Sequence, residues 1–155
     1  MNKYRTHNCA ELREKNIGEN VKLSGWLHRK RDHGNLLFID LRDHFGITQC
    51  VIESNHKDFK NIEKLKPESV ILVSGKVLKR SKETENKELT TGLIEIKINE
   101  MIVLSNSNEL PLPVFGDQEY PEEIRLKYRF IDLRRKEMHE KIKLRSSVIS
   151  YLRNK

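Results

Sequence analysis

The residues best suited to binding chemistry lie in the segment 21–52, where one aromatic side chain stands among polar ones. Phe38 lies on the same side of its predicted strand as Asp40 and Arg42, so it would project from the polar face of that strand. The basic cluster Arg29-Lys30-Arg31 precedes it. Any base of a single-stranded nucleic acid can stack on an exposed ring, while neighbouring cations hold the phosphates. Phe38, Arg29 and Arg31 are therefore candidate nucleic-acid contacts.

Simpler interpretations of these residues stay open. Phe38 would be a core residue if the alternation shifts by one position across a bend in the strand. A short run of cations, here or at 79–82, is more often a solvated strand end than a binding site.

The distribution of charge limits what the basic clusters can mean. The net charge is +7, but residues 1–123 hold 19 Lys and Arg against 20 Asp and Glu. Residues 124–155 hold 11 against 3. The first segment is thus no general basic surface, and a nucleic-acid site there must rest on local clusters.

Other chemistries are not indicated. Cys9 and Cys50 lie far apart without paired spacing, and His7 near Cys9 lacks partner ligands, so we expect neither a disulfide framework nor a metal site. Paired carboxylates, a glycine-rich phosphate loop and a nucleophile–base pair are absent from the sequence, so we expect no catalytic residue. The N-terminus does not resemble a signal peptide and no apolar run suits a membrane span, which predicts a soluble, cytoplasmic protein.

The pattern of apolar residues predicts the elements that would position these side chains. Three strands are expected in 21–52, the second at 36–42 and the third at 47–52, with a bend at Gly25. An amphipathic helix at 56–65, a strand at 69–78, a polar loop at 79–92 and a strand at 94–104 follow. A capping-box pattern at 8–11 predicts a short helix that ends near residue 16.

Five strands, a helix between the third and fourth, and a long loop between the fourth and fifth are typical of the OB-fold, a mainly β Greek-key barrel. Its oligonucleotide face is made by strands two and three, with the loops joining strands one to two and four to five. Phe38, the basic cluster and the loop 79–92 all fall on that face. This agreement favours the nucleic-acid interpretation.

The chain is predicted to have three parts. Residues 1–104 form the OB-fold domain, and 105–121, which contain three prolines, form a linker. Residues 122–155 form two helices, the second with an apolar stripe that nothing else in the sequence covers: Met138, Ile142, Ile149 and Leu152. We expect this part to be the start of a truncated second domain.

Longer motifs resemble one enzyme family. LPLPVFGDQEYPEEIRLKYRFIDLRR, residues 110–135, is similar to the junction of bacterial aspartyl-tRNA synthetases, where an OB-fold joins a class II catalytic domain. GWLHRKRDHGNLLFIDLRDHFGITQCV, residues 25–51, resembles the anticodon-binding strands of that family, and TTGLIEIKI, residues 90–98, resembles its fifth strand. The resemblance covers nearly the whole chain and implies an N-terminal fragment of such an enzyme.

The resemblance implies a role for each matching residue on the barrel. Phe38 would stack on the middle anticodon base, and Gln49 would hydrogen-bond the bases there. Arg31 and Glu95 would read the third base, since a carboxylate accepts from an exocyclic amine and a guanidinium donates to base acceptors or phosphate. Without the resemblance, Gln49 and Glu95 would be taken as ordinary surface residues.

Three further residues belong to the implied tRNA interface. Arg29 lies in the basic strand end, and Arg80 would touch a phosphate from the loop 79–92, which would wrap the anticodon stem-loop. His33 stands where family members strict for one tRNA often carry Leu. Histidine there resembles the relaxed members that also charge the asparagine tRNA, whose anticodon differs at the third base.

The resemblance also implies the activity of a parent enzyme. It would activate aspartate with ATP and Mg²⁺ and esterify tRNA, as a homodimer formed through its catalytic domain. The motifs for ATP and aspartate would lie beyond residue 155, so the fragment is expected to bind tRNA without catalysis and without a cofactor. The alternatives are an asparaginyl- or lysyl-tRNA synthetase OB domain, a stand-alone single-strand-binding module, and an OB-fold used only for protein contacts.

Overall fold

The computed structural model describes residues 2–116 and 118–155, which form two compact units divided between Asn108 and Glu109. The first unit contains β1 (Asn20–Asp32), β2 (Leu36–Arg42), β3 (Ile47–Glu53), α1 (Phe59–Lys64), β4 (Val70–Lys79) and β5 (Ile94–Ser105), preceded by a 3₁₀ turn (Glu14–Asn16). The second contains α2 (Glu122–Lys127), α3 (Arg129–Asp132) and α4 (Lys136–Arg153).

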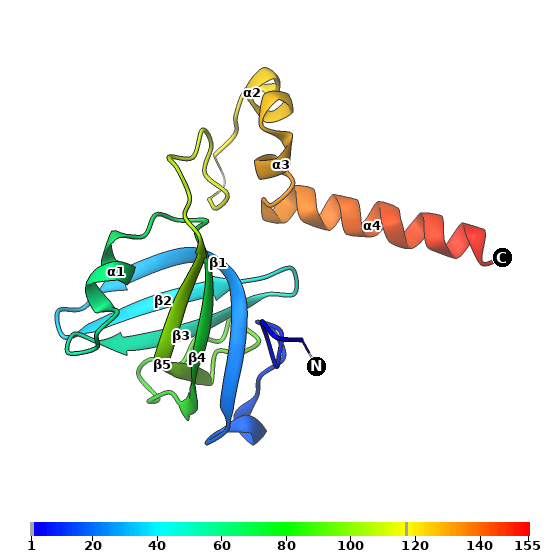
Figure 1. The fold of residues 1–155 in the computed structure, drawn as a ribbon. Coiled ribbons are helices and arrows are strands. Elements are labelled where there is room, and N and C mark those ends of the chain that lie inside the picture. The colour runs from blue at the N-terminus through cyan, green and yellow to red at the C-terminus, as the bar shows by residue number, and fades with distance from the viewer. Residues whose placement is uncertain (1, 117) are drawn as a thin grey trace. The chain divides into compact units, whose positions relative to one another are not determined.

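The strands of the first unit close into a barrel in the order β1-β2-β3-β5-β4 (Figure 1). Every neighbouring pair is antiparallel except β3 and β5, which pair in parallel through Cys50↔Ile96 and Val51↔Lys97. The helix α1 lies between β3 and β4 in the sequence and places Ile62 in the barrel core. The predicted fold, a mainly β five-stranded barrel with a helix between its third and fourth strands, is confirmed.

Alternation along β2 separates the core from the outer face of the barrel. Leu37, Ile39 and Leu41 are buried, whereas Phe38 and the other residues between them are partly exposed. Because successive side chains in a strand point to opposite faces, the three aliphatic residues fill the core and Phe38 stays outside it. The alternative interpretation of Phe38 as a core residue is therefore wrong.

Two glycines allow strands to cross closely. A Cβ on Gly25 would lie 2.2 Å from the main-chain oxygen of Arg42, and one on Gly75 would lie 2.2 Å from that of Lys97. The register of β1 against β2 shifts between Leu27 and Arg29, three positions after the bend expected at Gly25. Gly25 thus serves close approach, and the irregularity follows it.

The helix predicted at residues 8–16 does not form; this segment contains turns and the short 3₁₀ turn. Half of the capping box is present, because the Asn8 amide donates to Oε2 of Glu11 at 3.0 Å. The Cys9 amide, however, donates to Asp43 at 2.9 Å, and the Cys9 carbonyl accepts from Thr48 at 2.5 Å. These bonds to the barrel replace the helical ladder.

The second unit has its own small core, made by Leu112, Val114 and Ile131. Leu112 and Val114 fall within the segment expected to be a linker, so part of that segment packs under the helices instead. On α4, the apolar side chains of Ile142, Ile149 and Leu152 are 42%, 50% and 65% exposed. Among the described residues, no helix combines the length and apolar character needed to cross a bilayer.

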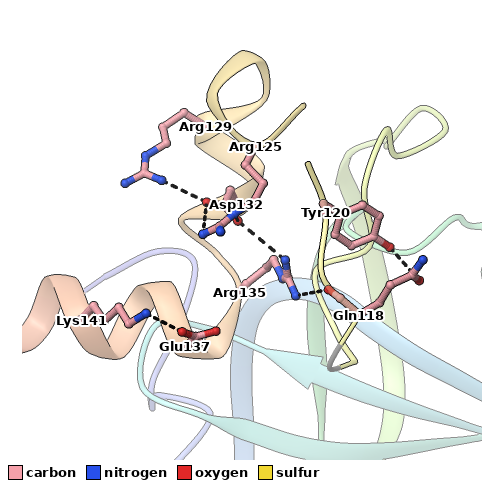
Figure 2. A network of polar contacts seen from close by, with 8 residues as sticks. All are labelled: Gln118, Tyr120, Arg125, Arg129, Asp132, Arg135, Glu137 and Lys141. Carbon is pink, nitrogen blue, oxygen red and sulfur yellow. Dashed lines mark hydrogen bonds and ion pairs between the residues drawn. The ribbon is translucent and has the colours of Figure 1, made fainter. Parts of the chain in front are cut away.

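A buried carboxylate organises the second unit (Figure 2). Asp132 is fully buried and accepts from Arg125 at 3.2 and 3.3 Å and from Arg129 at 3.0 Å. Arg135 lies 3.8 Å from the same carboxylate and donates to the main-chain oxygen of Gln118 at 2.6 Å. Burial of a charge is costly unless it is paired, and three guanidinium groups meet that requirement here.

Candidate nucleic-acid interface

The aromatic platform is formed where β1 turns into β2. Phe38 pairs in register with Arg31 on β1 and with Val51 on β3, so it lies on the outer face of the central strand of three. The turn is held by the Asp32 side chain, which accepts from the amide of Gly34 at 2.8 Å. His33 lies edge-on to the Phe38 ring, with 5.3 Å between centroids and 89° between planes. The ring is thus positioned but not covered by the core.

A chain of hydrogen bonds runs across four strands beside this platform. Arg31 Nη2 donates to Oδ1 of Asp40 at 2.9 Å and to Oε1 of Gln49 at 3.0 Å. Gln49 Nε2 in turn donates to Oε2 of Glu95 at 2.9 Å. The structure therefore brings Arg31, Gln49 and Glu95 together, although they lie far apart in the sequence.

Sequence reasoning missed Asp40 as a member of this chain. Its side chain is 14% exposed and lies two positions after Phe38 on the same face of β2. The register Asp40↔Gln49 and Arg29↔Asp40 places it between two candidate binding strands. The sequence did contain a signal: Asp40 lies two positions after Phe38, so strand alternation puts both side chains on the same face, the candidate binding face.

The chain of bonds orients donors and acceptors for a nucleic-acid base. In the part of the chain that the structure describes, the hydrogen bonds of the Arg31 guanidinium all come from Nη2, so its Nε and Nη1 can donate to other acceptors. Gln49 is only 5% exposed, so it presents an edge rather than a mobile side chain. Side chains of these types read the edges of splayed, unpaired bases.

Arg80 lies differently from the expected phosphate contact. It is 4% exposed, and its guanidinium donates to the main-chain oxygens of Ile94 at 2.9 Å and Thr84 at 3.2 Å. Burial lowers the pKa of Arg80, and the nearby carboxylates of Glu95 and Asp40 oppose that shift. In this conformation Arg80 fixes the base of the loop and does not offer its charge to a phosphate at the surface.

The loop between β4 and β5 also packs more than its polar composition predicted. Thr91 is 1% exposed and donates to the main-chain oxygen of Ile47 at 2.6 Å. The amide of Asn86 donates to the Gly92 oxygen at 3.1 Å, and a Cβ on Gly92 would lie 1.7 Å from the Asn86 oxygen. The loop folds back on itself beside β3.

The three consecutive cations of β1 have different surroundings. Arg29 is exposed, and Arg31 belongs to the bond chain described above. Lys30 instead donates to the main-chain oxygens of Glu63 and Leu65, both at 2.6 Å, at the C-terminal end of α1. Only the two arginines of the cluster therefore face the candidate interface.

The described residues contain no group of three or more His, Cys, Asp or Glu side chains placed to hold a metal ion. Cys9 and Cys50 are both free and buried, and burial raises the pKa of each thiol. The polar chain beside Phe38 is thus the arrangement with the clearest binding chemistry in this part of the protein.

Comparison with known proteins gives concordant matches. Residues 21–104 match the tRNA anticodon family model, described as an OB-fold nucleic acid binding domain. Over 99% of its length the chain is 60% identical to an "Aspartate--tRNA(Asp/Asn) ligase" of Pelagibacter ubique, and it is 56% identical over its full length to one of Bradyrhizobium diazoefficiens. The chain spans about a quarter (26%) of each of these relatives.

A solved structure has the same fold. Asparaginyl-tRNA synthetase from Pyrococcus horikoshii, complexed with asparaginyl-adenylate, superposes with a TM-score of 0.82 and 26% identity. The match covers 96% of this chain and 33% of that one.

Proposed function

The chain belongs to the tRNA anticodon family of OB-fold nucleic acid binding domains, and from that premise we propose that it reads the anticodon of aspartate tRNA as part of an aspartate–tRNA ligase. The relatives at 56–60% identity that carry this ligase name support the assignment. They favour it over an asparaginyl- or lysyl-tRNA synthetase, because they carry the aspartate name, and the asparaginyl enzyme matched in structure is only 26% identical.

One observation carries the proposal: a partly exposed ring, Phe38, lies beside the chain Arg31–Gln49–Glu95 on the outer face of the barrel. Phe38 stacks on the middle anticodon base, which contributes about 1–3 kcal/mol. Gln49 hydrogen-bonds the bases there, and Arg31 and Glu95 read the third base.

Arg29 and His33 complete the proposed interface at the β1–β2 turn. Arg29 is exposed and attracts the phosphate backbone. His33 lies perpendicular to the Phe38 ring beside it and favours relaxed reading of the third base, so that aspartate and asparagine tRNAs both bind. The relatives named for both tRNAs support this part of the proposal.

The remaining properties of the ligase are proposed from its relatives. In this proposal, aspartate activation with ATP and Mg²⁺ belongs to the part of the ligase that corresponds to the remainder of its relatives, outside the quarter that this chain spans. The ligase works in the cytoplasm as a homodimer formed through its catalytic domain. The exposed apolar side chains of α4 support a protein contact on that helix.

The test is equilibrium binding of the 155-residue chain to RNA stem-loops that differ only in the anticodon. We expect GUC and GUU loops to bind within about tenfold of each other, a difference of about 1.4 kcal/mol. Loops with other middle bases bind more weakly. The variant Phe38→Ala should lose about tenfold or more in affinity. Phe45→Ala, which removes an aromatic ring that is 54% exposed, is the matched control and should change little.

Each outcome separates the alternatives. If the wild-type chain and the Phe38→Ala variant each bind every stem-loop with equal affinity, the chain is a general single-strand binder. No binding even at low salt, where electrostatic attraction is strongest, would indicate an OB-fold that contacts proteins only. A preference for GUC over GUU beyond about tenfold would exclude relaxed reading by this unit.

A further inference from the structure

Asp40 holds a position that the proposed anticodon contacts do not explain. It is a carboxylate on the face of β2 that carries Phe38, where RNA phosphates would approach. A negative charge there repels the RNA phosphates and lowers the affinity for RNA. Its presence on this face therefore calls for a compensating role. Its side chain is 14% exposed, so it lies below the surface on which a base would rest.

The contacts of Asp40 show what that role is. Arg31 Nη2 has two hydrogens, and it bridges Oδ1 of Asp40 at 2.9 Å and Oε1 of Gln49 at 3.0 Å. A charge-assisted bond of this kind restrains the long Arg31 side chain, which is 38% exposed. With Nη2 occupied, the planar guanidinium has one orientation in which Nε and Nη1 remain available.

We propose that Asp40 is a positioning residue for anticodon discrimination: it holds the Arg31 guanidinium against Gln49, so that the fork of Arg31 meets the third base in a single orientation. The proposal rests on the proposed function. Asp40 touches no RNA; it acts through Arg31. It contributes specificity at the expense of the general attraction between the barrel and the phosphate backbone.

Charge and positioning predict opposite results, which makes the proposal testable with Asp40→Asn. If Asp40 acted only as a negative charge, its removal would strengthen binding to every RNA. If it positions Arg31, the variant binds the GUC loop about fivefold more weakly, because the Asn oxygen can still accept from Nη2 but lacks the charge that strengthens the bond. The ratio of affinities for GUC and GUG loops then narrows to within about twofold.

The experiment measures both affinities for the 155-residue chain by fluorescence anisotropy, with thermal unfolding to check the fold. Glu100→Gln is the matched control, because it removes the same charge from an exposed position on β5. It should leave the ratio unchanged. Tighter binding of Asp40→Asn to both loops, with the ratio retained, would overturn the proposal.

Two further variants keep the test decisive. In an Arg31→Ala background, Asp40→Asn should no longer change the ratio; a full effect there would mean that Asp40 does not act through Arg31. Asp40→Glu keeps the charge but displaces the carboxylate, so the ratio should narrow even if the Asn variant does not fold. An unchanged ratio in Asp40→Glu counts against the proposal.

Failure of the inference and failure of the proposed function are distinguishable. A wild-type chain that does not prefer GUC over GUG contradicts the proposed function itself. A wild-type chain that does prefer GUC, with Asp40 variants that keep the preference, contradicts only the role of Asp40.

Discussion

The guanidinium of Arg31 reaches over β2 to place Nη2 3.0 Å from Oε1 of Gln49, a residue on a strand that is not its neighbour in the barrel. Together with the bond from Gln49 to Glu95, this contact determines which end of the Gln49 amide faces which charged group. The amide oxygen faces a cation, and the amide nitrogen faces an anion. The orientation of Gln49 is therefore set before any RNA arrives.

The first prediction concerns that orientation. Gln49→Glu removes the donor to Glu95 and places a second carboxylate beside it at a position that is 5% exposed. We expect a loss of about 2 kcal/mol in the free energy of unfolding, measured with urea, and weaker binding of the GUC stem-loop. Gln49→Met, which fills the same volume without a charge, should cost less. Equal stability of the two variants would contradict this account.

A second prediction concerns Lys30. Its ammonium donates to three main-chain oxygens at the end of α1, those of Ile62 at 3.3 Å and of Glu63 and Leu65 at 2.6 Å, and burial lowers its pKa. Lys30→Met leaves these acceptors without the cation. The free energy of unfolding should fall by about 1–2 kcal/mol.

The matched control for Lys30, which lies on β1, is Lys60→Met, because it removes the same charge from an exposed position on α1, the helix whose end Lys30 contacts. It should change stability by less than about 0.5 kcal/mol. Both variants remove one positive charge, so a larger loss of RNA affinity in Lys30→Met would show that Lys30 contacts RNA directly, contrary to its position in the structure.

The third prediction concerns the second unit. Asp132→Asn keeps the shape of the side chain but removes the charge that pairs with Arg125, Arg129 and Arg135. Three guanidinium groups then repel one another around a neutral amide. The free energy needed to open α2 and α3 locally should fall by about 3 kcal/mol, so their amide hydrogens should exchange faster.

Glu137→Gln serves as the control for that experiment, because its ion pair with Lys141 is on the exposed surface of α4. Exposed pairs contribute little, so exchange in α2 and α3 should not change. Unchanged exchange in Asp132→Asn as well would mean that the buried carboxylate does not hold the unit together.

The fourth prediction concerns pH. Burial lowers the pKa of His28, and the positive charge of Arg42 acts in the same direction. Between the unfolded and folded pKa values, the unfolded chain binds more protons at His28, so stability rises with pH there. As pH falls below about 6.5, the unfolded value for histidine, this contribution to stability is lost.

The measurement is urea unfolding from pH 7.5 to 5.0 for wild type and His28→Asn. One proton contributes at most about 1.4 kcal/mol per pH unit, so the wild-type curve should be steeper by no more than that amount. Parallel curves for the two proteins would show that His28 has the same pKa in the folded and unfolded states.

Local sequence patterns were sufficient for the barrel. Strand alternation has a period of two, so the phase of Leu37, Ile39 and Leu41 indicated that Phe38 lies outside the core, but only the structure excluded a shift of that phase across a bend. The same local reasoning failed at residues 8–16, where the barrel supplies bonds to Cys9 that compete with a helix. Local propensity predicts an element only where no distant partner takes its backbone groups.

The neighbours Lys30 and Arg31 show where sequence reasoning ends. Both belong to the basic cluster that the sequence presents as one feature, yet one caps α1 and the other joins Asp40 and Gln49. Adjacent residues of a strand point to opposite faces, and the register shift before Arg29 decides which face each one has. Such a shift depends on pairing with a distant strand.

By itself, the sequence determined the order of the strands along the chain and the resemblance to a tRNA-binding family, because apolar spacing and long motifs are written in local order. The tertiary structure alone decided that Arg80 is buried under its loop and that Asp40 joins Arg31 to Gln49. Those contacts join residues on different strands, and the number of residues between two strands in the sequence does not predict whether their side chains are close in space. Only closure of the barrel brings their side chains within hydrogen-bonding range.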